Sequence, residues 1–298
     1  MTTVQPFSPP PESFSAFEAA IGDREFERLQ GLIEREAGIR LGPTKRALLV
    51  GRLGRRLHEL SMTSFREYCA KVESDPAERV EMLDRIATNE THFFREQRHF
   101  DLLSQEILPR WHAEAERGLR PRKISVWSAA CSTGEEPFTL AMVLLRAFPP
   151  GTGWSIAILA SDISTRVLRA AREAVWPIAR AAEIPEPELK RFMLKGVGDQ
   201  EGLMRAGPEL REVVRFARVN LVEPYPALGT LDLVFCRNVL IYFDVATKHA
   251  VVSRLLDHLA PDGYLFLGHA ESLAGSPLHL QTVSPSVYRR PGASEGGR

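Results

Sequence analysis

Two adjacent glutamates follow the single glycine of a short loop, AACSTGEEP, in which Gly134 precedes Glu135 and Glu136. A dinucleotide site needs several glycines, because the backbone must approach a pyrophosphate closely. Two carboxylates at this position would also repel phosphate. The loop therefore predicts a ligand without phosphate, and a cationic ligand such as S-adenosylmethionine suits it. The alternative is that both glutamates only complement the dipole of the following helix.

Asp162 ends the next apolar run of the sequence. An acidic residue after a strand can accept hydrogen bonds from both hydroxyls of a ribose. Asp162 could equally cap the helix that follows it. Because each of the two acidic loops follows its own apolar run, together they favour a cofactor that contains ribose.

Apolar runs alternate with amphipathic helical segments after residue 121. Strands are predicted at 123–131, 154–163, 231–243 and 263–269, and helices at 134–148, 164–176 and 246–260. This alternation predicts an α/β fold, with a parallel sheet covered by helices on both faces. Such sheets bind ligands at the carboxyl ends of their strands. Glycines and prolines at about 184–217 interrupt the alternation and predict an insertion made of a helix and a hairpin.

Residues 16–88 have helical periodicity and predict a separate all-α domain. One helix is expected at about 44–60, and Asp75 followed by Pro76 predicts the start of another. We expect disordered tails at 1–15 and 291–298, a linker and connecting helix at 89–120, and the α/β domain at 121–290.

The composition argues against several classes of protein. Lys and Arg total 38, as do Asp and Glu, so the formal charge is zero and does not favour a surface that binds nucleic acid. No apolar run is long enough to span a membrane, and the first residues lack the pattern of a secretory signal. Three cysteines without a CxxC pair fit a reducing cytoplasm. We expect no metal, because no HxxxH, DxD or Cys/His cluster has ligand spacing.

Six sequence blocks together resemble the CheR family, the methyltransferases of bacterial chemotaxis receptors. They are ATNETHFFRE at 87–96, WSAACSTGEEP at 127–137, ASDIS at 160–164, VNL at 219–221, FCRNVLIYFD at 235–244 and GHAESL at 268–273. The resemblance implies a class I, Rossmann-like methyltransferase domain with a small inserted β-subdomain, preceded by an all-α domain. It also implies methyl transfer from S-adenosylmethionine to receptor glutamates, with S-adenosylhomocysteine as product.

The resemblance also implies which residues bind and act. By motif, the cofactor contacts would be Asn89, Thr91, Arg95, Asp162, Asn220, Leu221, Arg237, Asn238 and one of Glu135 and Glu136. Arg95 and Tyr242 match positions near the transferred methyl, where a guanidinium can bind a carboxylate bidentately and a phenol can donate one hydrogen bond. A substrate glutamate is already ionised at pH 7, so no general base is needed. His92, the nearest candidate base, is expected to be packed or hydrogen-bonded instead.

A basic stripe runs along the helix expected at 44–60. Lys45, Arg52 and Arg56 fall on one face, flanked by Arg46 and Arg55. The stripe would attract the acidic cytoplasmic helical domain of a chemoreceptor; the alternative is an ordinary solvated face.

The insertion carries KGVGDQEG, in which Gly196, Gly198 and Gly202 suit a hairpin that a partner backbone approaches closely. In the CheR family this subdomain can bind the C-terminal peptide of a receptor as an added strand. A flexible loop is the alternative.

Three other functions remain open from the sequence. The chain could be a CheR-like methyltransferase of a signalling pathway other than chemotaxis, a methyltransferase of another substrate, or a signalling module that binds the cofactor without turnover. A dehydrogenase is disfavoured, because the glycine-rich phosphate loop is missing. We expect a cytoplasmic protein that binds no nucleic acid and does not insert into a membrane.

Overall fold

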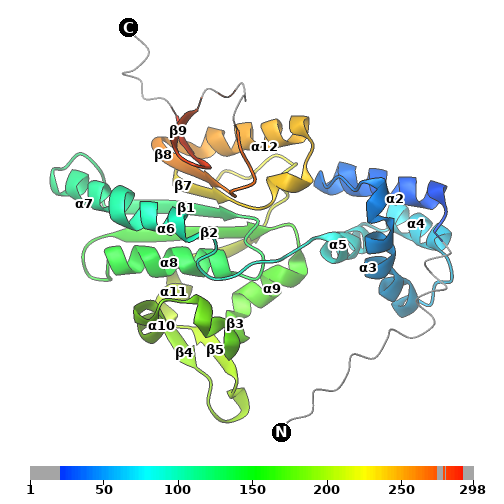
Figure 1. Ribbon diagram of the computed structural model, residues 1–298, viewed down its shortest axis with the longest axis horizontal. Helices are drawn as coiled ribbons and strands as arrows, with labels where there is room; N and C mark the ends of the chain where they lie inside the picture. Colours follow the sequence, from blue (N-terminus) through cyan, green and yellow to red (C-terminus); the bar gives the residue numbers. More distant parts are fainter. Residues whose placement is uncertain (1–20, 274–277, 279, 291–298) are drawn as a thin grey trace. The chain divides into compact units, whose positions relative to one another are not determined.

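The computed structural model describes residues 21–273, 278 and 280–290, and the chain divides into two compact units between Thr88 and Asn89 (Figure 1). The tails expected at 1–15 and 291–298 lie outside the described residues. No described helix has the length and apolarity needed to cross a membrane. The three cysteines Cys69, Cys131 and Cys236 are free and buried.

The described part of the first unit is helical, as predicted. Its elements are α2 (Asp23–Ala37), η1 (Pro43–Lys45), α3 (Arg46–Glu59), α4 (Phe65–Ser74) and α5 (Pro76–Ile86). The Asp75 side chain accepts hydrogen bonds from two backbone N–H groups at the start of α5, and Pro76 occupies the first helical position. Leu49, Leu53 and Leu57 share the buried face of α3, so the amphipathic pattern of this helix builds the core of the unit.

The second unit contains a seven-stranded sheet. In spatial order the strands are β6 (Val214–Arg218), β2 (Ser155–Asp162), β1 (Lys123–Ala129), β7 (Leu231–Cys236), β8 (Leu259–Leu267), β10 (Val287–Arg289) and β9 (Gln281–Ser284). The strands from β6 to β8 are parallel, and β10 is antiparallel to both of its neighbours. The chain leaves β1 toward β2 on one side and returns to β7 on the other, which makes the gap between β1 and β7 a topological switch point.

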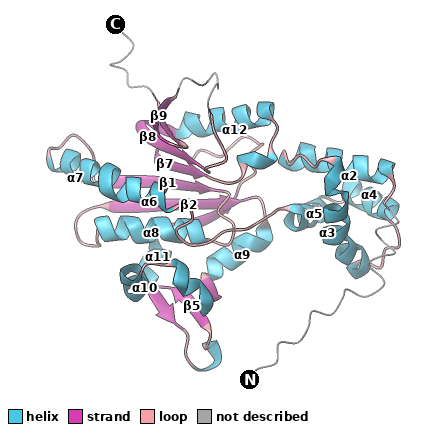
Figure 2. Ribbon diagram, viewed as in Figure 1, coloured by secondary structure: helices cyan, strands magenta, loops and turns pink. Residues whose placement is uncertain are grey.

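Helices cover both faces of this sheet, which confirms the α/β prediction (Figure 2). They are α6 (Gln97–Leu102), the π-helical η2 (Leu103–Ile107), α7 (Leu108–Glu116), α8 (Glu135–Ala147), α9 (Thr165–Glu173) and α12 (Val245–His258). Phe138 of α8 packs in one core with Phe235 of β7. The preceding strand residue, Val234, packs in a second core with Leu255 of α12. Successive side chains of a strand thus enter opposite cores.

A small antiparallel sheet, ordered β3-β5-β4, is inserted between α9 and β6. Its elements are β3 (Val175–Pro177), η3 (Ile178–Glu183), α10 (Glu186–Phe192), β4 (Met193–Lys195), η4 (Gly198–Gln200), β5 (Leu203–Ala206) and α11 (Pro208–Val213). The insertion starts before the predicted residue 184, because β3 pairs with β5. It also ends before residue 217, because β6 pairs with β2 in the main sheet.

Candidate active site

The loops at the carboxyl ends of β1, β2, β6, β7 and β8, together with the segment before α6, form the candidate site. Five residues of these loops are not glycine and have left-handed backbone conformations: Phe94 (φ 53°), Glu96 (φ 61°), Ala130 (φ 67°), Ser132 (φ 50°) and Asn238 (φ 59°). Each such conformation costs on the order of 1 kcal/mol. The surrounding contacts must therefore hold these loops in place.

Asp162 joins two of these loops. Its side chain is nearly buried and accepts hydrogen bonds from the backbone N–H groups of Ser132 and Ser164, each at 2.9 Å. The interpretation of Asp162 as the cap of α9 is wrong, because the hydroxyl of Ser164 caps that helix by accepting from Val167 N–H. A carboxylate is a hydrogen-bond acceptor of the kind that ribose hydroxyls use, and Asp162 lies where the loops after β1 and β2 meet.

The two adjacent glutamates of α8 have different surroundings. Glu135 is 1% exposed, accepts a 2.6 Å hydrogen bond from the Thr133 hydroxyl and lies 4.0 Å from Arg180. Glu136 accepts hydrogen bonds from the hydroxyl of Ser128 (2.7 Å) and the guanidinium of Arg237 (3.1 Å). Burial raises the pKa of both carboxyl groups. Glu136, on the side of β1 and β7, therefore faces the switch point.

Arg237 lies between two carboxylates. Its guanidinium is 3.1 Å from Glu136 Oε2 and 3.1 Å from Glu96 Oε2, donates to the carbonyl of Arg95, and has a side chain only 1% exposed. Burial opposes ionisation of Glu96, but Arg237 and hydrogen bonds from His269 N–H and Asn238 outweigh it and lower the pKa of Glu96. Two carboxylates and one guanidinium leave a formal charge of −1 in a buried place, which favours a cationic ligand.

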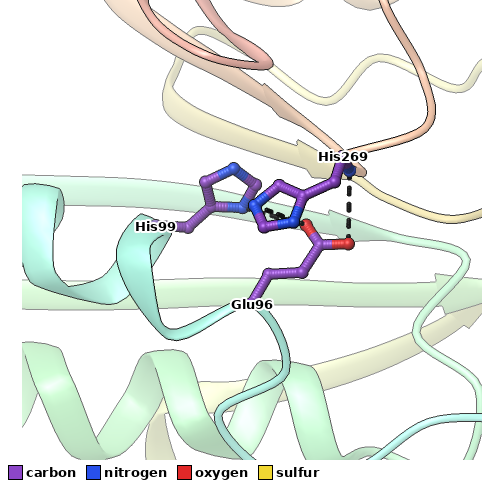
Figure 3. A group of neighbouring side chains, drawn as sticks. All are labelled: Glu96, His99 and His269. Atoms are coloured by element: carbon purple, nitrogen blue, oxygen red, sulfur yellow. Dashed lines mark hydrogen bonds and ion pairs between the residues drawn. The ribbon is translucent and has the colours of Figure 1, made fainter.

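Glu96 also meets two histidines (Figure 3). Its Oε2 lies 3.4 Å from His99 Nδ1 and 3.8 Å from His269 Nε2. Among the described residues these three form the group whose ligand atoms, within 4.8 Å of one another, could hold a metal ion. No motif of the sequence predicts this group, because His269 lies far from Glu96 and His99 along the chain. Because Arg237 places a fixed positive charge 3.1 Å from the same oxygen, we interpret the group as a polar cluster that orients Glu96.

The segment 89–95 is tied to neighbouring loops of its own unit. The carbonyl of Asn89 accepts a 2.8 Å hydrogen bond from the Ser132 hydroxyl, and that of Thr91 accepts a 3.1 Å bond from Arg180. Arg95 Nη1 donates to the carbonyl of Glu90 at 2.8 Å. The first two contacts place Asn89 beside the loop after β1 and Thr91 beside the insertion, and the bond from Arg237 to the Arg95 carbonyl places Arg95 beside the loop after β7.

His92 is exposed, and its Nδ1 lies 3.1 Å from the Phe93 carbonyl. The prediction that His92 is hydrogen-bonded is confirmed.

Asn220 and Leu221 form the turn after β6. The backbone N–H of Val219 donates to the carbonyl of Asp162 at 3.2 Å, which places this turn beside the end of β2. Asn220 bonds Glu223 through its amide nitrogen (2.8 Å) and accepts from Val222 N–H through its oxygen. Leu221 is buried.

The loop after β7 carries the remaining expected residues. Asn238 donates from its side chain to Glu96 Oε1 at 3.2 Å. Tyr242 ends the turn η5 (Leu240–Tyr242) and is partly exposed. The structure thus gathers the expected cofactor residues and both expected catalytic residues at one edge of the sheet.

The basic stripe of α3 is largely neutralised within its own unit. Arg56 forms a bidentate ion pair with the buried Glu78 (2.9 and 2.7 Å), which raises the pKa of Arg56. Arg52 donates to the carbonyl of Ile86 and to Thr88 Oγ1. These two guanidinium groups bind the end and the start of α5, and their role as substrate contacts stays a prediction.

Of the other three basic residues of the stripe, one is paired and two keep exposed positive charge. Arg46 pairs with Asp23 and lies over the ring of Phe26. Lys45 is exposed, and Arg55, with a side chain 78% exposed, lies 3.5 Å from Glu59. Lys45 and Arg55 thus present the charge that remains on this face.

The three glycines of the insertion are explained by the hairpin itself. A side chain at Gly196 would overlap the carbonyl oxygen of Gln200, while Gly198 (φ 58°) and Gly202 (φ 82°) have left-handed backbones with open space around them. Close approach by a partner backbone is therefore not needed to explain these glycines.

Comparison with known proteins decides the family. Residues 89–289 match the family described as CheR methyltransferase, SAM binding domain, and residues 24–87 match CheR methyltransferase, all-alpha domain. The chain belongs to the CheR methyltransferase family. It is 38% identical to chemotaxis protein methyltransferase 2 of Pseudomonas aeruginosa over 95% of this chain and 99% of the relative. It is 39% identical to the chemotaxis protein methyltransferase of Escherichia coli and 37% identical to that of Salmonella typhimurium, each over 90% of this chain and 91% of the relative.

S-adenosylmethionine is therefore the cofactor of this CheR domain, as the sequence predicted. The residues present fit it. The buried excess of negative charge at Glu96, Glu136 and Arg237 suits a sulfonium and an ammonium group, and the Asp162 carboxylate is an acceptor suited to ribose hydroxyls. Phosphate, by contrast, would meet carboxylates in the loop after β1.

Proposed function

We propose that this protein methylates glutamate side chains of bacterial chemoreceptors, in the cytoplasm, giving glutamyl methyl esters and S-adenosylhomocysteine. The observation that carries the proposal is the match to curated chemotaxis methyltransferases over nearly the full length of both chains. The acidic character of the site, which disfavours ligands that contain phosphate, supports the proposal independently.

Methyl transfer to a carboxylate requires little proton transfer by the protein. The cofactor supplies a methyl group made electrophilic by its sulfonium. A glutamate with a pKa near 4.3 is an anion at pH 7, so its oxygen needs no base. Both charges disappear in the reaction, which a site shielded from water favours. Alignment of the acceptor is then the main task of the chain's own residues.

We assign the cofactor to a defined set of side chains. They are Asn89, Thr91, Arg95, Glu136, Asp162, Asn220, Leu221, Arg237 and Asn238. Glu136 is chosen over Glu135, because Glu135 is engaged by Thr133 and lies toward Arg180. We assign the acceptor carboxylate to Arg95, whose guanidinium has donors beyond the one bonded to Glu90, and to the half-exposed Tyr242.

Two surfaces are proposed for the receptor. Lys45 and Arg55 of α3 offer exposed positive charge to the acidic helical domain. The outer edge of β4, the last strand in the order β3-β5-β4, can accept the C-terminal receptor peptide as an added strand. Near this edge Leu194 and Val197 are 54% and 79% exposed. Calorimetric titration with a receptor-tail peptide tests the second surface.

The test of the function uses methyl-labelled S-adenosylmethionine and membranes that contain chemoreceptors. Carboxyl methyl esters release their label in alkali, so alkali-labile receptor label is the expected result. Alkali-stable label would indicate another acceptor group. Binding of the cofactor with no label transferred would indicate a signalling module without turnover.

A further inference from the structure

A fully buried carboxylate lies in the loop after β8. Glu271 is 0% exposed. Its Oε2 accepts hydrogen bonds from the backbone N–H groups of Asn238 and Gly268, each at 2.7 Å, and its Oε1 accepts from Ile241 N–H at 3.2 Å. One side chain therefore joins the loops that follow two adjacent parallel strands, β7 and β8.

Both loops reached by Glu271 belong to the site. Asn238 has a left-handed backbone (φ 59°), a conformation that needs external support in a residue with a side chain. Ile241 lies in the turn η5 and directly precedes Tyr242. Without the carboxylate, three backbone N–H groups would lose their acceptor, and a backbone N–H group that is left buried without a partner is destabilising.

The packing at Gly268 supports the same interpretation. A Cβ atom there would lie 2.7 Å from Asn238 Nδ2, 2.8 Å from Glu271 Oε2 and 2.9 Å from Asn238 N. The two loops are thus in contact without space for a methyl group. Glycine is required here by this close approach.

We infer that Glu271 is a positioning residue for methyl transfer. It fixes Asn238 for the cofactor and Tyr242 for the acceptor carboxylate, while touching neither ligand. The inference rests on the proposed function for its second half, since the role of Tyr242 is part of that proposal.

The first variant is Glu271→Gln, which keeps the shape but replaces one acceptor oxygen with a donor that faces a backbone N–H. We expect kcat to fall at least tenfold and the Kd for S-adenosylhomocysteine to rise severalfold, with the KM for receptor unchanged. Glu188→Gln is the matched control, because Glu188 is also a buried carboxylate but lies in α10 of the insertion, where it pairs with Arg146 of α8. Whatever this control does to Tm, it should leave kcat and that Kd at their wild-type values.

The second variant, Gly268→Ala, places a methyl group against Asn238 and Glu271 and so disturbs the same contact. It should also lower kcat and raise the Kd for S-adenosylhomocysteine. Gly51→Ala, at an open position of α3, is its control. Wild-type kcat and Kd in both folded variants would overturn the inference, as would a loss of activity that only follows the folded fraction. If wild-type protein failed to methylate receptor, the proposed function would fail. The Kd for S-adenosylhomocysteine, compared between wild-type protein and the variants, would still test whether Glu271 positions Asn238.

Discussion

Two neighbouring carboxylates on one helical turn have different partners in this protein. Because Glu136 faces Arg237 and Glu135 faces Thr133, replacing each with glutamine should have different effects. We expect Glu136→Gln to raise the Kd for S-adenosylmethionine about tenfold, which corresponds to about 1.4 kcal/mol. Glu135→Gln should lower Tm and leave this Kd within about twofold. Titration calorimetry measures both, and equal effects on affinity would contradict the assignment.

His99 gives the stability of the second unit a defined pH dependence. Burial lowers the pKa of His99 to about 4, with Arg237 and His269 adding to the shift and Glu96 opposing it. The unfolded chain, with a pKa near 6.5, therefore binds a proton that the folded chain does not between pH 6.5 and 4. Stability should be complete above pH 6.5 and should fall by roughly 2 to 3 kcal/mol as the pH drops to about 4.

Urea unfolding at several pH values checks this expectation. His99→Gln should remove this part of the slope, while substitution of the exposed His92 should keep it. An unchanged slope in His99→Gln would show that other groups cause the acid sensitivity.

Some residue roles were readable from the sequence and others were not. Asp162 and the pair of glutamates follow strands whose apolar runs are evident, so their arrival at one edge could be predicted. Which glutamate faces the site could not, because both lie in the first turn of α8 and only tertiary contacts distinguish them. Glu96 was missed because its partners, Arg237 and His269, lie far along the chain.

At the scale of elements, α3 has a structural role, and we propose that it also has a docking role. Arg56→Ala breaks the pair with Glu78, and removing one partner of a buried pair costs about 3 to 5 kcal/mol. It should therefore lower Tm markedly. Arg55→Glu should leave Tm nearly unchanged but raise the KM for receptor severalfold, because it reverses exposed charge.

Steady-state methylation at increasing salt tests this division of roles. Wild-type KM should rise with salt, and the rise should be smaller in Arg55→Glu. A KM that is insensitive to salt in both proteins would remove α3 as a docking surface.

Central strands were predicted and edge strands were missed. The runs that became β1, β2, β7 and β8 are continuous and apolar, as burial on both faces requires. β6 (Val214–Arg218) contains two arginines and pairs only with β2, while β9 and β10 are short and lie at the other edge. Edge strands carry charge and few apolar residues, so periodicity gives little sign of them.

For the whole molecule, the order of strands and the family motifs lead to the same conclusion. A switch point between β1 and β7 predicts a ligand site there, and the acidic residues around it favour a cationic ligand. The sequence could indicate this much, because the residues that contact a cofactor cluster in short blocks after strands. The surface that receives a receptor depends on which arginines are already paired, and this is a property of the packed helices.

The most direct test of the central claim is peptide mass spectrometry of a chemoreceptor cytoplasmic domain after incubation with this protein and S-adenosylmethionine. We predict single methyl groups on glutamate side chains, lost on treatment with alkali and not formed without the enzyme. Methyl groups on another residue type, or an unmodified receptor despite tight binding of S-adenosylhomocysteine, would contradict the account.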